Sequence, residues 1–139
     1  MATEYTIYLT YAEAAFLHLD HMRRLGEMRC GAFDRSLIES ALARPQQVAA
    51  YENADLIRQA ATFYFGLVKN HPWVGGNKRT SSLLVDEFLF RNGIEVNASL
   101  QETLALVLNI EADIWNIDII EAWLREHTSP LNETTQVKE

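Results

Sequence analysis

Cysteine and basic residues are scarce in this sequence, and each scarcity excludes a class of protein. The single cysteine, Cys30, cannot form an internal disulfide, which excludes a small secreted fold held together by disulfides. Twelve Lys and Arg stand against 19 Asp and Glu, a net charge of −7, so the chain lacks the basic face that binds nucleic acid or an anionic membrane surface. Neither an apolar run of about 18 residues nor a signal-peptide pattern is present. We therefore expect a cytoplasmic protein with no direct nucleic-acid partner and no membrane partner.

Apolar residues recur at helical spacing through most of the chain, of which 48% is hydrophobic. Two capping boxes, Thr10 with Glu13 and Ser99 with Glu102, mark helix starts. Pro45 is expected to end the second helix, because the residue before a proline avoids the α region. The predicted helices cover residues 10–25, 34–44, 53–70, 77–92, 99–108 and 116–124, with a short extended piece at 94–96. The sequence thus predicts an all-α, single-domain bundle of about six helices with at most a short strand or hairpin, over residues 1–128, followed by a flexible tail over residues 129–139.

The stretch between the third and fourth predicted helices carries the most unusual chemistry. It reads His71-Pro72-Trp73-Val74-Gly75-Gly76-Asn77-Lys78-Arg79-Thr80. Glycines allow close approach to a ligand, and the start of a helix offers unpaired N–H groups and a positive dipole end. Lys78 and Arg79 are electrostatically mismatched with that dipole unless an anion is present, which indicates a phosphate site.

A histidine beside a phosphate site is a natural general base toward an incoming hydroxyl, so His71 completes a set suited to phosphoryl or nucleotidyl transfer. Asn77 can donate a hydrogen bond to a phosphate oxygen. The plainer interpretation stays open on physical grounds. Gly-Gly before a helix is often only a turn, and Lys-Arg on a surface helix is usually solvated.

The same stretch resembles a motif of the Fic/Doc superfamily, in the form H-P-F-x-[D/N]-G-N-K-R-T found in Doc-type toxins. Trp73 stands for the family's Phe, and Lys78 and Ser82 stand where AMP-transferring Fic enzymes have Gly and a second Arg. Further matches extend the resemblance over about residues 6–127, including the run Glu39-Ser40-Ala41-Leu42-Ala43-Arg44-Pro45.

The resemblance implies a toxin of a toxin–antitoxin module that transfers the γ-phosphate of ATP to a Thr or Ser of a translation factor similar to elongation factor Tu. It also implies Mg²⁺ as a companion of ATP and a Phd-like antitoxin as partner. Carried over by position, His71 would be the base, with Asn77, Lys78 and Arg79 as the catalytic phosphate holders. The implied nucleotide- and phosphate-binding set is Gly75, Gly76, Asn77, Lys78, Arg79 and Thr80, and no metal ligand is assigned.

Two positions depart from the family pattern. Gly75 stands where an Asp, Glu or Asn would hold Mg²⁺, and neither Asp86 nor Glu87 is expected to replace it. Phe33 stands where Doc-like proteins often have an arginine, which Arg35 could replace. Two alternatives therefore accompany the kinase: a Doc-fold binding module with weakened or lost catalysis, and an AMP-transferring Fic enzyme.

Other candidates receive structural interpretations. His18 and His21 are expected on a solvated face of the first helix rather than in a metal site, and Cys30 is expected to have no chemical role. The segment from Ser129 to Thr134 resembles a Fic regulatory sequence only by chance. The aromatic residues are expected in the core or lining a groove for an antitoxin segment, namely Phe63, Tyr64, Phe65, Trp115 and Trp123.

Overall fold

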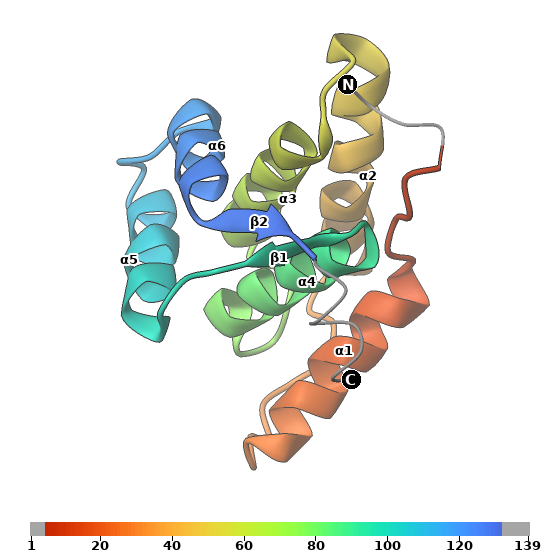
Figure 1. Cartoon of the computed structure of the whole chain (residues 1–139). Helices are drawn as coiled ribbons and strands as arrows, with labels where there is room; N and C mark the ends of the chain where they lie inside the picture. The colour runs from red at the N-terminus through yellow and green to blue at the C-terminus, as the bar shows by residue number, and fades with distance from the viewer. Residues whose placement is uncertain (1–4, 132–139) are drawn as a thin grey trace.

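Six helices and one two-stranded ribbon make up the computed structural model, which describes residues 5–131 (Figure 1). This confirms the predicted all-α domain with one short pair of strands. In chain order the elements are α1 (Tyr11–Arg24), α2 (Arg35–Glu52), α3 (Leu56–Asn70), α4 (Asn77–Arg91), β1 (Ile94–Val96), α5 (Leu100–Glu111), α6 (Ile117–Glu126) and β2 (Thr128–Pro130).

Side chains cap five of these six helices, as the sequence predicts. Thr10 and Ser99 form complete capping boxes with the glutamates three residues on. The other three side-chain caps are Asp34, Asp55 and Asn116, each accepting a hydrogen bond from the first turn. Because such a cap contributes about 1 kcal/mol, local chemistry alone places most helix starts.

The prediction that Pro45 ends the second helix is wrong, because α2 continues through it to Glu52. Proline removes one helical N–H and disfavours the helix, by about 3 kcal/mol in an exposed interior. Here Pro45 is buried and shares the core-facing stripe of α2 with Ile38, Ala41 and Val48. Burial of this stripe offsets the cost, and the helix ends at Asn53, which adopts a left-handed conformation at φ 53°.

Helix α3 lies at the centre of the bundle, between α2 and α6 in Figure 1, with α4 packed along it. Phe63 and Tyr64 of α3 are almost fully buried, as expected of core aromatics. Phe65, Trp115 and Trp123 are partly buried and pack against the same core. A helix buried on nearly every side is a rigid base for the residues at its end.

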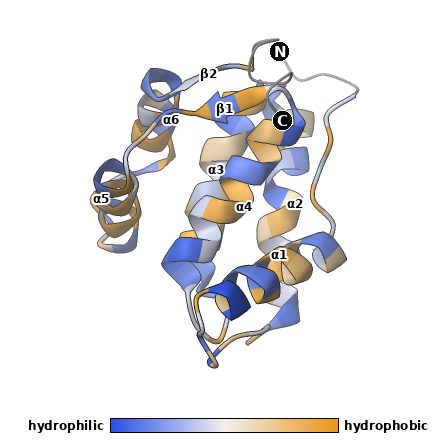
Figure 2. Ribbon diagram, turned by 60° about the horizontal axis from the view of Figure 1, so that its bottom comes forward, coloured by the Kyte–Doolittle hydropathy of each residue, from blue (hydrophilic) through white to orange (hydrophobic). Residues whose placement is uncertain are grey.

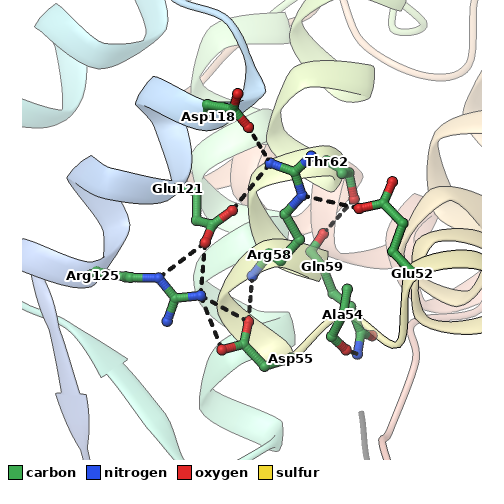
Figure 3. Close-up of polar contacts among 9 residues, drawn as sticks. All are labelled: Glu52, Ala54, Asp55, Arg58, Gln59, Thr62, Asp118, Glu121 and Arg125. Carbon is green, nitrogen blue, oxygen red and sulfur yellow. Dashed lines mark hydrogen bonds and ion pairs between the residues drawn. The ribbon is translucent and has the colours of Figure 1, made fainter. Parts of the chain in front are cut away.

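An ion network joins the start of α3 to α6 (Figure 3). Arg58 contacts Asp118 at 2.6 Å and Glu121 at 3.1 Å, and Arg125 bridges Glu121 and Asp55. Because these side chains are partly solvated, each pair contributes well under about 1 kcal/mol. The network therefore orients α6 on α3 more than it stabilises the fold.

The two strands pair antiparallel, with Glu95 opposite Ser129 and Val96 opposite Thr128. Residues 129 and 130, which the sequence analysis assigned to the tail, thus lie in β2. Residues 132–139, with the second half of the segment that resembles the regulatory sequence, lie outside the described residues. Within residues 5–131, none of the helices has the length and apolar character needed to cross a membrane.

Candidate functional site

The loop between α3 and α4 begins with a sharp turn at His71. This residue is the C-cap of α3 and has left-handed backbone angles, φ 47° and ψ 53°. The turn reverses the chain, so that His71 lies close to the first turn of α4. His71, Gly76, Asn77, Lys78 and Arg79 together line a depression of about 340 Å³. The structure therefore brings together five of the residues that the sequence singled out.

The backbone of this loop is held along its length by residues 31–34. The carbonyl of Pro72 accepts hydrogen bonds from the N–H groups of Phe33 at 2.9 Å and Asp34 at 3.3 Å. The N–H of Val74 donates to the carbonyl of Gly31 at 2.9 Å. These bonds fix the approach to α4 before any ligand arrives.

The side chain of Asn77 closes the loop on itself. Its Oδ1 accepts from the N–H of Trp73, and its Nδ2 donates to the carbonyl of the same residue, both at 2.9 Å. An amide carries two N–H hydrogens, so a second donor remains for a ligand in the depression. Asn77 thus braces the loop while lining the predicted site.

Both glycines of the Gly75-Gly76 pair are required by their surroundings. A Cβ on Gly75 would lie 2.5 Å from the backbone oxygen of Arg29, closer than nonbonded atoms approach. Gly76 has φ 65°, and a Cβ there would lie 2.6 Å from the sulfur of Met22. The positive φ expected of a Gly-Gly turn is found at Gly76, whereas Gly75 is needed for close packing.

Gly75→Ala is expected to destabilise the fold by about 1–3 kcal/mol, the usual cost of overpacking against a rigid neighbour. The obstruction is backbone, so the segment around Arg29 has to move. Urea unfolding measures the change as a lower midpoint. Val74→Ala, at a partly exposed neighbouring side chain, is the control and should cost less than about 1 kcal/mol. Equal midpoints for Gly75→Ala and wild type would show that the Arg29 segment yields freely.

His18 is fully buried, so the prediction that it faces solvent is wrong. The N–H of Gly31 donates to its Nε2 at 2.9 Å, which leaves the proton on Nδ1, 2.8 Å from the hydroxyl oxygen of Thr80. Its ring stacks on Trp73 at 4.2 Å between centroids. Burial, with a smaller contribution from the charge of His21, lowers the pKa of His18 to about 4. A neutral imidazole therefore locks the loop to α1 and α4.

Thr80 lies in the core, where its hydroxyl is bound to His18. Thr80 is not among the residues that line the depression, so its position does not support the phosphate-holding role predicted for it. Arg35, suggested as a replacement for a missing arginine, lies over the ring of Tyr11 at 4.1 Å and pairs with Glu39. Neither side chain contributes a charge to the depression.

Two arginines near the loop have no ion-pair or aromatic partner in the part of the chain that the structure describes. Of the nine arginines, six pair with carboxylates and Arg44 lies over Phe65, whereas Arg29 and Arg79 have neither kind of partner within residues 5–131. Arg79 lines the depression, and the Cβ of Arg29 is 3.6 Å from where a Cβ on Gly75 would be. A protein of net charge −7 thus leaves Arg79 unpaired in the depression, which favours an external anion there, and the backbone of Arg29 packs beside it against Gly75.

The N-terminus of α4 adds backbone donors to these charges. Its N-cap, Gly76, provides no side-chain hydrogen bond, unlike the other five caps among the described helices. The first turn of α4 is coloured hydrophilic in Figure 2, at the end of the helix nearest the loop. Uncapped N–H groups and the positive dipole end both favour an anion.

Glu111, the last residue of α5, also reaches the site, which the sequence analysis did not foresee. Its Oε2 lies 3.3 Å from Nε2 of His71 and 3.2 Å from Nζ of Lys78. No local pattern links residue 111 to residues 71–79, since their contact depends on how α5 packs. Arg29 was missed for the same reason, although its nearness to Gly31 in the chain was a weak signal.

A larger groove of about 620 Å³ adjoins the depression and shares Lys78 and Arg79 with it. Its walls are mostly apolar, from Leu25, Leu83, Leu104 and Val107 among others. Asp86 lies in this groove, where burial raises its pKa to about 6. Glu87 pairs instead with Arg91.

The side chains at the loop do not fit a resident Mg²⁺. Gly75 has no room for a carboxylate, and residues 5–131 contain no group of three or more His, Cys, Asp or Glu that could hold a metal. Glu111 is a single carboxylate, already shared by two partners. A hard cation prefers several oxygen ligands, so we assign none of the chemistry below to a metal held by this chain.

Comparison with known families gives a match over the part of the chain that contains the loop. The model of the Fic/DOC family matches residues 8–89, which is more than half of the chain and includes α1 to α3, the whole loop and most of α4. No curated protein matches the sequence. On the family match, this chain belongs to the Fic/DOC family.

Proposed function

We propose that this protein is a Doc-type phosphotransferase, which moves the γ-phosphate of ATP to a Thr or Ser hydroxyl of a translation factor resembling elongation factor Tu. One observation carries the proposal. An unpaired Arg79, with Lys78 and the uncapped start of α4, shares a single depression with His71. Transfer of a phosphoryl group needs mainly positioning and charge stabilisation, which these groups supply.

The proposed step follows from the positions of the groups. A ring nitrogen of His71 takes the proton of the substrate hydroxyl, and that oxygen forms a bond to the γ-phosphorus. The bond from the γ-phosphorus to the bridging oxygen breaks, and ADP leaves with both electrons. Arg79 grips phosphate oxygens in a bidentate manner and Lys78 acts as a point charge, while the second N–H of Asn77 donates to another oxygen.

The position of Ser82 favours phosphoryl over AMP transfer. By the resemblance, AMP-transferring Fic enzymes have a second arginine at this position. The hydroxyl of Ser82 instead accepts a hydrogen bond from Tyr64 at 2.8 Å. Because the motif has one arginine fewer than that of AMP-transferring enzymes, we assign transfer of the γ-phosphate. AMP transfer is a competing outcome of the experiment described below.

A second candidate function is a binding module without catalysis, favoured by the packing at Gly75. Because a side chain there would meet the backbone of Arg29, the carboxylate expected from the family cannot simply be restored. The anion site would persist in such a module, since it depends on Arg79, Lys78 and the start of α4.

A transfer experiment separates these functions. The protein is incubated with Mg²⁺, elongation factor Tu, and ATP labelled at either the α or the γ phosphate. We expect label on the factor from the γ position only, and its loss in His71→Asn. Label from the α position would establish AMP transfer, and no label from either position would favour the binding module.

The apolar groove beside Lys78 and Arg79 suits the partner that the resemblance implies. We propose that a segment of a Phd-like antitoxin occupies it, with apolar side chains on Leu83 and Leu104 and a basic side chain near Asp86. Because the groove and the depression share two cations, such a segment would also cover the phosphate site.

A further inference from the structure

Glu111 occupies the same groups that a phosphate and a substrate hydroxyl would need. A single oxygen, Oε2, contacts both Nε2 of His71 and Nζ of Lys78. While this contact persists, Lys78 is neutralised and Nε2 of His71 is not available to take a proton. The carboxylate of Glu111 therefore hinders both phosphate binding at Lys78 and proton uptake by His71.

The position of Glu111 is set by the packing of α5. Leu106, Val107 and Ile110 of the same helix are buried in the core. Directly after the helix, Asp113 pairs with Lys69 of α3, but the Asp113 side chain is largely exposed, so the buried residues rather than this pair hold the end of α5 in place. Glu111 is thus presented to the site by a fixed helix end, and only its side chain needs to turn for it to leave.

Electrostatics makes the contact competitive with an anion. A phosphate on Lys78 would lie within a few Å of the carboxylate, and like charges at that separation repel. Other anion-binding groups, Arg79 and the start of α4, have no such internal competitor within residues 5–131. The competition is therefore local to Lys78 and His71.

We propose that Glu111 is an internal competitor of the anion, which closes the site in the ligand-free protein and is displaced when a polyphosphate binds. Glu111 lies outside residues 8–89, which match the family model, so the proposal concerns this chain's own α5. It rests on the proposed function only in that the loop binds phosphate groups.

Calorimetric titration with pyrophosphate, with and without Mg²⁺, tests the proposal without requiring any transfer activity. Glu111→Gln keeps the shape of the side chain and removes its charge. We expect it to bind pyrophosphate about tenfold more tightly than wild type in both conditions, the factor expected from one partly solvated charge near an anion.

Asp113→Asn is the matched control, because it removes an equal charge two residues away without a contact to His71 or Lys78. Asparagine also tolerates the left-handed backbone of residue 113, at φ 62°. This control should change the affinity by less than about twofold, as expected of a solvated charge outside the site. In a Lys78→Gln background, the gain from Glu111→Gln should largely disappear.

Several results would overturn the proposal. Unchanged or weaker binding by Glu111→Gln, in either condition, would show that the carboxylate does not compete, and weaker binding only with Mg²⁺ would make it a cation ligand instead. An equal gain in pyrophosphate affinity in Asp113→Asn, or a gain from Glu111→Gln that persists in the Lys78→Gln background, would show that the effect comes from the net charge of the protein and not from this contact. If neither wild type nor any variant binds pyrophosphate, the phosphate site itself fails, and the proposed function with it.

Discussion

Replacing His71 by asparagine is expected to lower the rate of phosphoryl transfer by about 10²- to 10⁴-fold, the range that a general base contributes. Asparagine suits this position because it accepts the left-handed backbone, φ 47°, that alanine adopts only at a cost. The variant therefore removes the imidazole and leaves the turn. Initial rates with labelled ATP measure the loss, and growth arrest on expression reports it in cells.

The thermal midpoint of His71→Asn should match that of the wild type, since the imidazole is about half exposed and its ion-pair partner among the described residues is Glu111. Comparison with His71→Ala separates the two effects, because only the alanine variant should also strain the turn. A His71→Asn protein with the wild-type rate would remove the general base from the mechanism.

Acid is expected to loosen the loop through His18, at a cost of about 3 kcal/mol between pH 6.5 and pH 4. The pKa of His18 is lowered from 6.5 to about 4 in the folded protein, so the unfolded chain takes up the proton first as pH falls. The stabilisation is complete above about pH 6.5 and is lost as pH falls through about 4. Protonation of Nε2 would also place a proton opposite the N–H of Gly31.

Urea unfolding of wild type and His18→Gln at several pH values measures this effect. Glutamine cannot take up the proton, so the difference in unfolding free energy between the two proteins should shrink as pH falls from 6.5 to 4. Carboxylates such as Glu13, whose pKa is lowered by hydrogen bonds from Thr10 and Arg91, titrate in both proteins and cancel in the difference. A difference that stays constant with pH would mean that His18 is not held neutral by burial.

Local sequence signals predicted most of the fold and which residues of the loop line the depression. A capping residue lies within a few positions of the helix that it starts, which is why Thr10, Ser99 and Asn116 were predicted correctly. The gathering of His71 with Lys78 and Arg79 was also predictable, because one short loop carries all three.

What the sequence did not indicate depends on packing between distant segments. The burial that keeps Pro45 helical comes from the core, and the partners of His18 are 13 and 62 residues away along the chain. Glu111 meets Lys78 only because α5 folds back beside α3 and α4. Tertiary contacts therefore determine the structure at Pro45, His18 and Glu111, and local sequence patterns do not report such contacts.

The pairing of β1 with β2 closes residues 94–130 into a loop that contains α5 and α6. Two kinds of contact hold this segment to α3. One is the buried face of each helix, and the other is a set of partly solvated ion pairs such as Arg58 with Asp118. Segments of this kind open as cooperative units at a lower free energy than global unfolding. Such an opening would also carry Glu111 away from His71 and Lys78 while α1 to α4 keep the loop intact, so it is a second and rarer route to an accessible site than rotation of the Glu111 side chain.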